Sequence, residues 1–245
     1  MEKHKKNFSI KAAFKEAWTL FWEKPWLYLG ILAIGILVSI LQPQGFFQDP
    51  SFLMQFLLFI WGAIMWALGV IITIGSADIA IKAVRGKKPV FSDLWKKISL
   101  FWRYLGLSII LILGVSLIVG VLLLPAIISP YLNVTNPLYM GLAALPVAII
   151  VTMLSIGFMF YVYVLIDHPK DSVRDQLKRS WAITEGVKWK LFGYIFAQAG
   201  VVLLGLLALG VGMLVALPVV AIATASVYES LKKQTRYNPK KDKHD

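Results

Sequence analysis

The sequence predicts an all-α integral membrane protein with six transmembrane helices. Of its 245 residues, 58% are hydrophobic and only 16% are charged, a balance that ordinary soluble domains do not have. Four long runs contain no Asp, Glu, Lys or Arg, namely 26–48, 51–77, 104–166 and 191–228. Because a helical span needs about 20 apolar residues, the third and fourth runs must each fold back once.

The boundaries of the six spans follow from these runs and from the turn residues inside them. Residues 130–137, with a proline at each end, predict the turn of the third run, and Gly210 and Gly212 predict the turn of the fourth. The expected spans are 26–41, 52–81, 104–128, 138–166, 191–209 and 213–231.

A spacing of tryptophan and glycine recurs ahead of each odd-numbered span. The three copies are Trp18, Trp26 and Gly30; Trp95, Trp102 and Gly106; and Trp181, Trp189 and Gly193. Each copy begins as a charged, periodic segment and continues into uncharged sequence. We therefore predict three repeats of a cytoplasmic amphipathic helix and a transmembrane hairpin, over about 8–81, 90–166 and 172–231, within a single membrane domain (1–245) that ends in a disordered basic tail (232–245).

The first two amphipathic helices are predicted from apolar residues at intervals of three and four. Ser9 can cap the first helix, and Pro25 can start the span behind it, because the missing N–H of proline is harmless in a first helical turn. The second helix is expected over about 91–102, with Trp95 on its apolar side and Asp93 on its polar side.

The third amphipathic helix is predicted to begin at Ser172. Ser172 and Asp175 resemble a capping box in which Asp replaces Glu. Gly186 can end this helix in a left-handed turn. Its expected apolar side consists of Val173, Leu177, Trp181 and Thr184.

The distribution of charge predicts the topology. The net charge is +12, and the basic residues fall in four clusters, at 3–15, 82–103, 170–190 and 232–243. The alternate connections, at 42–51, 129–137 and 210–212, contain no Lys or Arg. The positive-inside bias then predicts that both termini are cytoplasmic. We expect the protein in the cytoplasmic membrane. The basic clusters would meet anionic phospholipid headgroups, so membrane phospholipids rather than nucleic acid are the expected polyanion.

Several residues carry a resemblance to a known family. They are Ser180 and Trp181, Gly186, residues 189–193, Leu217 and Pro218, residues 225–228, and the N-terminal segment 14–18. Together they resemble a family of six-span membrane proteins that includes the membrane domain attached to some glycerophosphoryl diester phosphodiesterases. The resemblance implies a six-helix membrane fold without an assigned activity. It does not imply the phosphodiesterase reaction, because the soluble barrel that carries that reaction is absent from this sequence.

Residues for catalysis or metal binding do not form a recognisable pattern. The chain has no cysteine, and its three histidines, His4, His168 and His244, are far apart in the sequence. A P-loop, an H-E-x-x-H motif and a nucleophile elbow are all missing. We therefore expect neither an enzyme nor a bound cofactor or metal.

A transport function is the alternative that the sequence leaves open. Asp78, Asp167 and Glu229 each lie at the predicted cytoplasmic end of an even-numbered span and could form a ring of acids. Local pairing with a lysine four residues on is the more economical interpretation for Asp78 and Glu229. Gln198, in the middle of the fifth span, could bind a solute or form an interhelical hydrogen bond, which is the interpretation we favour.

The leading hypothesis is a non-enzymatic membrane protein that acts through lipid or protein partners at a basic cytoplasmic face, with a homo-oligomer as one form of partner. The candidate residues combine positive charge with interfacial aromatic rings. They are Lys96, Lys97, Lys178, Arg179, Trp18, Trp95 and Trp181. The alternative is a transporter, or a transporter subunit, for a small or amphiphilic solute.

Overall fold

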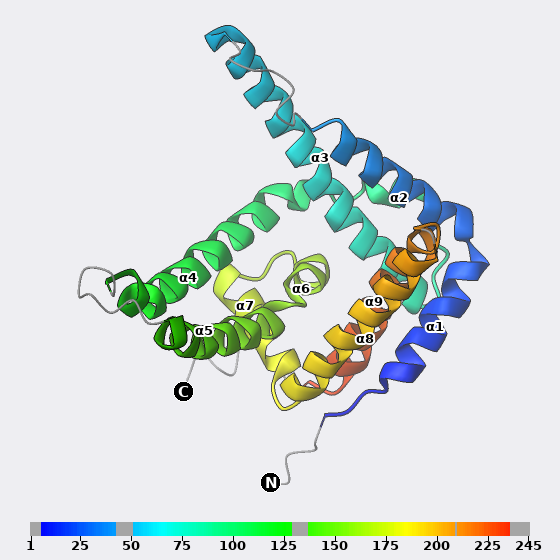
Figure 1. Ribbon diagram of the computed structural model, residues 1–245. Helices are drawn as coiled ribbons and strands as arrows, with labels where there is room; N and C mark the ends of the chain where they lie inside the picture. Colours follow the sequence, from blue (N-terminus) through cyan, green and yellow to red (C-terminus); the bar gives the residue numbers. More distant parts are fainter. Residues whose placement is uncertain (1–5, 43–50, 129–136, 209, 236–245) are drawn as a thin grey trace. The chain divides into compact units, whose positions relative to one another are not determined.

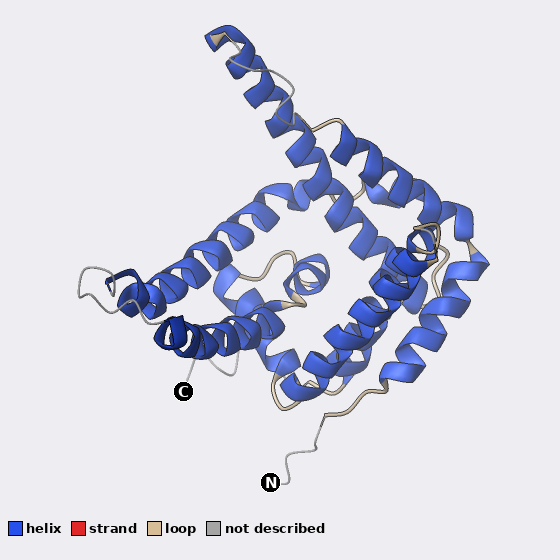
Figure 2. Cartoon of the chain, in the orientation of Figure 1, coloured by secondary structure: helices blue, strands red, loops and turns tan. Residues whose placement is uncertain are grey.

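The structure is a computed structural model that describes residues 6–42, 51–128, 137–208 and 210–235 (Figure 1). Within these residues the chain forms α-helices and short 3-10 turns, and no strand occurs there (Figure 2). The α-helices are α1 (Ile10–Glu23), α2 (Pro25–Ile40), α3 (Phe52–Val84), α4 (Phe101–Ile128), α5 (Pro137–Phe158), α6 (Tyr161–Asp167), α7 (Val173–Thr184), α8 (Lys188–Leu207) and α9 (Met213–Lys233). The 3-10 turns η1 (Phe91–Leu94) and η2 (Ile98–Leu100) lie between α3 and α4.

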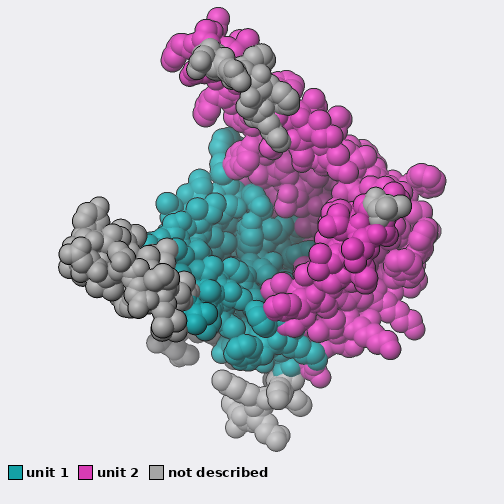
Figure 3. Space-filling view, in the orientation of Figure 1, with its two compact units in different colours: residues 1–6, 102–192, 235–245 teal, residues 7–101, 193–234 magenta. Residues whose placement is uncertain are grey.

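The chain packs as two compact units, coloured separately in Figure 3. Unit 1 comprises residues 1–6, 102–192 and 235–245, and unit 2 comprises residues 7–101 and 193–234. The prediction of a single membrane domain built from three repeats stays a prediction.

Five stretches of the described chain are helical, long and apolar enough to cross a membrane. They are Phe52–Val84, Phe91–Val121, Leu145–Asp167, Lys188–Leu207 and Met213–Lys233. A sixth is possible if α1 and α2, which meet at an angle of 94°, form one broken span. The predicted all-helical architecture with several membrane spans is confirmed at this level.

Two predicted spans differ in detail from the structure. The first, 26–41, corresponds to α2, whose 16 residues reach about 24 Å, less than the roughly 30 Å of a hydrocarbon core. The fourth, 138–166, is interrupted at Met159 and Phe160, where α5 ends and α6 begins. The other four agree with α3, α4, α8 and α9 to within a few residues.

Helix caps form where the sequence predicts them. The Ser9 hydroxyl accepts the N–H of Ala12 at 3.2 Å, and Pro25 occupies the first turn of α2. In unit 1, Ser172 Oγ accepts the N–H of Asp175 at 3.2 Å and donates to its carboxylate at 2.7 Å. These contacts are local in sequence, which is why spacing alone could predict them.

The second predicted amphipathic helix is wrong as drawn from the sequence. Residues 91–102 do not form one α-helix but the two turns η1 and η2 followed by the start of α4. Asp93, expected on the polar side, is buried. The tail also begins later than predicted, because α9 continues through Lys233. Residues 236–245 lie outside the described residues.

In unit 2, α9 forms the centre of the packing and contacts α1, α2 and α3. Small side chains on both partners, including Ala13 and Ala17 of α1 and Ala223 and Ala225 of α9, are buried. Small residues let helix backbones approach closely, which favours helix association where water does not drive it. Tyr194 of α8 packs against Phe14 of α1, with ring centroids 5.7 Å apart.

Candidate functional site

The candidate site is the segment of residues 85–98 in unit 2, which we name the basic loop. It begins where α3 ends. Gly86 has a φ of +69° and donates its N–H to the carbonyl of Ala83 at 2.9 Å. The N–H of Lys87 donates to the carbonyl of Lys82, also at 2.9 Å. This is a Schellman motif, in which glycine takes the left-handed conformation at low cost.

Asp93 fastens the basic loop to α3. Its Oδ1 lies 3.2 Å from Nζ of Lys82 and 2.7 Å from Nζ of Lys96. Its Oδ2 accepts the N–H of Val90 at 3.0 Å. Lys82 also lies 2.6 Å from Asp78, so two buried acids share one lysine. A buried charge is tolerated only when it is paired, and these contacts therefore hold the loop in one position.

A close backbone contact fixes the loop at a second point. Leu94 is fully buried, and a Cβ added at Gly75 of α3 would lie 2.2 Å from the carbonyl oxygen of Leu94 and 2.7 Å from its Cα. Only glycine fits beneath η1 at this place. A third point is the buried carbonyl of Pro89, which accepts a hydrogen bond from Lys24 Nζ at 2.8 Å.

The outer side of the basic loop combines cationic and apolar side chains. Arg85, Lys87, Lys88, Lys96 and Lys97 are its basic residues, against one acid. Its large apolar side chains with exposed fractions of 40% to 53% are Val90, Phe91, Trp95 and Ile98. A rigidly held segment that presents lysines among aromatic and aliphatic side chains is suited to the boundary between lipid headgroups and acyl chains.

The corresponding segment of unit 1, α7, uses its residues differently. Trp181 packs on Gly157 of α5, where an added Cβ would lie 2.4 Å from the indole ring. Its ring also contacts Phe158, with centroids 5.5 Å apart, and Lys188 Nζ lies 3.1 Å from the ring centroid. Trp181 is therefore an internal contact of unit 1 rather than a free interfacial anchor.

The polar side chains of α7 also point to its own unit. The hydroxyls of Ser180 and Thr184 donate to the carbonyl of Gly157 at 3.2 and 3.4 Å. That carbonyl lies in the last turn of α5, where carbonyl groups lack partners within the helix. The predicted apolar side is thus only partly right, because Thr184 is buried together with Gln176 and Ser180, whereas Val173, Leu177 and Trp181 are only half-buried.

The basic residues of α7 differ in their pairing, because Arg179 is bound by a carboxylate whereas Arg174 and Lys178 are exposed. Arg179 donates to the Asp171 carboxylate at 3.0 Å, and Lys178 is exposed. Lys6 donates to the carbonyl of Ala182. Burial lowers the pKa of Lys6, and the carboxylate of Glu185 opposes this effect.

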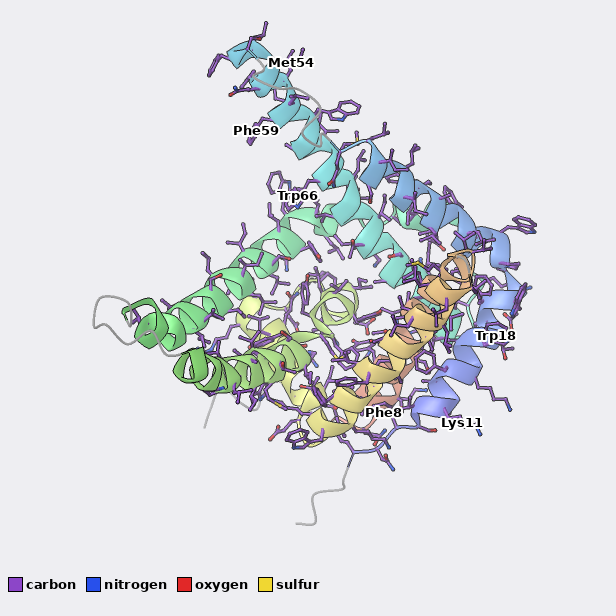
Figure 4. The ribbon with its side chains drawn as sticks, in the orientation of Figure 1. Phe8, Lys11, Trp18, Met54, Phe59 and Trp66 are labelled. Atoms are coloured by element: carbon purple, nitrogen blue, oxygen red, sulfur yellow. The ribbon has the colours of Figure 1, made fainter. Side chains whose placement is uncertain are left out.

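The first copy of the tryptophan spacing begins at Trp18, on α1 in unit 2. Lys11, Lys15, Trp18 and Trp22 are exposed, and Figure 4 shows Lys11 and Trp18 on the outer side of the helix. Their spacing of four, three and four residues places them along one stripe.

The proposed transport residues are engaged by neighbouring groups. Gln198 donates to the hydroxyl of Thr224 at 2.8 Å, which confirms the interhelical hydrogen bond that the sequence favoured. The pairing of Asp78 with Lys82 is also confirmed. Glu229 is bound by Arg85, the first residue of the basic loop, not by the predicted Lys233. Asp167 belongs to unit 1, so the ring of three acids stays a prediction.

Sequence reasoning missed three contacts, two at the basic loop and one in unit 1. Gly75, Gly157 and Arg85 have partners 19, 24 and 144 residues away in the chain. A glycine inside an apolar helix signals a close approach, but it does not name the partner. Among the described residues no group of three or more His, Cys, Asp or Glu could hold a metal ion.

Comparison with known proteins gives one match. Residues 1–235 match the family described as "Protein of unknown function (DUF975)". No curated protein and no solved structure matches the chain. The resemblance to the membrane domain of glycerophosphoryl diester phosphodiesterases has no match in support of it and stays a prediction.

Proposed function

This chain belongs to the DUF975 family, and we propose that it is a non-enzymatic, multi-pass protein of the cytoplasmic membrane that binds anionic phospholipid headgroups through its basic loop. The observation that carries the proposal is the construction of that loop. Asp93, Leu94 and Pro89 are buried and fixed, while Lys87, Lys88, Lys96 and four large apolar side chains are exposed and Lys97 is half-buried. Fixing the segment in advance lowers the entropy that binding must overcome.

The predicted repeat supports a shared cytoplasmic orientation of the three copies. Ala17, Leu94 and Ser180 each precede the first tryptophan of a copy, and all three have an exposed fraction of 0%. One residue earlier, each copy has a side chain in a polar contact. Glu16 accepts from Ser226, Asp93 pairs with Lys82, and Arg179 pairs with Asp171. The equal burial of Ala17, Leu94 and Ser180 favours three related repeats with the same orientation, and hence both termini on one side of the membrane. The basic clusters assign that side to the cytoplasm.

The lipid proposal is tested by titrating the purified chain in detergent with phosphatidylglycerol or phosphatidylcholine of identical acyl chains and counting bound lipids by native mass spectrometry. The test variant is Lys87→Gln/Lys88→Gln/Lys97→Gln, which leaves the Lys96 to Asp93 pair intact. Since a lysine near an anionic surface contributes about 1 kcal/mol, we expect the preference for phosphatidylglycerol to fall roughly tenfold or more.

The matched control removes an equal number of charges from the other unit. Lys170→Gln/Arg174→Gln/Lys178→Gln changes exposed residues at and near α7 and should leave most of the preference intact. Equal binding of both lipids by the unaltered chain would contradict the proposal. A control variant as weak as the loop variant would show that only total charge matters.

The orientation can be tested independently because the chain contains no cysteine. Single cysteines at Lys88 and Lys178 should react with a membrane-impermeant maleimide in inverted membrane vesicles and not in intact cells. Labelling of either position in intact cells would contradict the shared cytoplasmic orientation.

The transporter alternative has less support. The polar groups of Gln198, Asp78 and Glu229 each bind a neighbouring side chain. They are therefore poorly placed to bind a solute. Solute uptake by vesicles containing the purified chain, lost in Gln198→Leu, would favour this alternative over the lipid proposal.

A further inference from the structure

An apolar groove of about 440 Å³ lies between α1, α8 and α9 in unit 2. Its lining consists only of apolar residues and glycines, namely Phe14, Trp18, Val201, Leu204, Gly205, Ala208, Gly212, Val215, Ala216 and Val219. Apart from the indole N–H of Trp18, the side chains of this lining give a water molecule no hydrogen-bond partner.

The groove has room for a ligand because α8 and α9 pack closely through glycine and alanine, with no bulky side chain between them to fill the space. A Cβ added at Gly205 would lie 2.9 Å from Cβ of Ala216, and one added at Gly212 would lie 2.7 Å from the carbonyl oxygen of Gly205. The two helices therefore touch without bulky side chains at this end. Phe14 and Trp18 of α1 supply the large apolar wall on the other side.

One end of the groove leads to positive charge. Lys11 and Lys15 precede Phe14 and Trp18 by three residues each, which places each lysine next to a lining aromatic on the surface of α1. Both lysines are exposed, and Trp18 is 52% exposed. An indole at the mouth of an apolar groove, with ammonium groups one helical turn away, matches the boundary between a phosphate and its acyl chains.

We propose that this groove holds one acyl chain of an anionic phospholipid whose phosphate lies at Lys15 and Lys11. An extended protein segment would bring backbone polar groups that the groove cannot satisfy, and a helix, which satisfies its own, is about 10 Å across with its side chains, whereas an alkyl chain is narrow and brings no polar group. The acyl chain gains little by leaving a bilayer, so selectivity comes from the phosphate and the two lysines. The site is separate from the basic loop and does not depend on it.

The test uses phosphatidylglycerol that carries a diazirine on its acyl chain, diluted into phosphatidylcholine vesicles that contain the full chain. After illumination, mass spectrometry locates the adducts. We expect them on the groove side of α8, at Val201 and Leu204, at least fivefold above Leu203 and Leu206. The latter two are 58% and 54% exposed on the same helix but do not line the groove.

Matched variants separate the groove from general contact with bilayer lipid. Val201→Trp fills the groove and should remove the groove adducts, while Leu203→Trp should keep them. Lys11→Gln/Lys15→Gln should lower groove labelling by phosphatidylglycerol about fivefold and leave labelling by the matching phosphatidylcholine probe unchanged. The triple lysine variant of the basic loop should keep full groove labelling, so failure of the loop proposal and failure of this one can be told apart.

Two results would overturn the inference. Equal adducts at Leu203 and Val201 would identify ordinary bilayer lipid around α8. Equal groove labelling by phosphatidylglycerol and phosphatidylcholine probes would show that Lys11 and Lys15 do not select an anionic headgroup.

Discussion

The basic loop and α7 share a sequence pattern, but the tryptophan of the loop is exposed whereas that of α7 packs inside its own unit. In each, a fully buried residue precedes a tryptophan, and lysine or arginine residues lie close by. In the loop the buried residue is Leu94, whose backbone lies on Gly75, and Trp95 is 40% exposed. In α7 the tryptophan ring itself, Trp181, lies on Gly157. Where the backbone of the preceding residue packs on the glycine, as Leu94 does on Gly75, the tryptophan is exposed. Where the tryptophan ring itself packs on the glycine, as Trp181 does on Gly157, the ring becomes part of the packing of its unit.

The second difference is how each segment treats charge. The loop buries an acid, Asp93, and leaves most of its lysines outside, so its outer surface is positive. In α7, Arg179 pairs with Asp171, and the hydroxyls of Ser180 and Thr184 donate to the carbonyl of Gly157. A lipid-binding role therefore fits the loop better than α7, although their sequences suggested the same role for both.

The largest expected effect is at the glycine beneath the loop. Gly75→Ala places a Cβ where the Leu94 backbone lies, so η1 must move away from α3. Overpacking of this kind costs about 3 kcal/mol of unfolding free energy, measured by denaturation in detergent. Gly69→Ala, on the same helix with nothing within 4 Å of the added carbon, is the control and should be close to neutral. An equal, small effect of both would contradict the seat at Gly75. Gly157→Ala should cost less than Gly75→Ala, because its obstacle is a side chain that can rotate.

The next effect compares the two tryptophans. Trp181→Ala removes a ring that contacts Gly157 and Phe158, and we expect it to lower the unfolding free energy by about 2.5 kcal/mol. Trp95→Ala should change stability by less than about 1 kcal/mol but weaken binding of phosphatidylglycerol. Thermal denaturation and native mass spectrometry on the same two preparations measure both quantities. The comparison fails if Trp95→Ala proves the more destabilising of the two.

The ion pairs give a smaller difference. Asp93→Asn leaves Lys96 unpaired and Lys82 with one acid instead of two, and because the carboxylate is buried we expect a loss of about 2 kcal/mol. Asp171→Asn removes a carboxylate that is more exposed than that of Asp93 and should cost about 0.5 kcal/mol. Addition of salt during denaturation should reduce the second effect more than the first. Equal costs would mean that burial of Asp93 does not strengthen its pairing.

The membrane class, most of the spans and the helix caps could be predicted because each depends on residues close in sequence. Charge-free runs mark spans, Ser9 and Ser172 each accept a backbone N–H three residues on, and Gly186 takes the left-handed conformation, with a φ of +82°, just after α7. The basic loop could not be predicted in the same way, because residues 91–102 have the periodicity of a helix. The contact of the Leu94 backbone with Gly75 and the pairing of Asp93 with Lys82 prevent the helix. Gly75 and Lys82 both lie on another element, α3. The binding of Glu229 by Arg85, 144 residues away, also lies beyond any local pattern.

The smallest effect concerns two serines, Ser172 at the start of α7 and Ser92 in η1 of the basic loop. In Ser172→Ala, α7 loses the hydroxyl that accepts the Asp175 N–H and donates to its carboxylate, and the expected cost is about 1 kcal/mol. The loop has no serine cap, because the Asp93 carboxylate takes the N–H of Val90. Ser92→Ala is therefore expected to change the unfolding free energy by less than about 0.5 kcal/mol, measured by the same denaturation. If Ser92→Ala cost as much as Ser172→Ala, the loop would depend on a helix-type cap after all. A neutral Ser92→Ala, together with a destabilising Asp93→Asn, would show that the buried carboxylate of Asp93, rather than a serine hydroxyl, stabilises the start of η1.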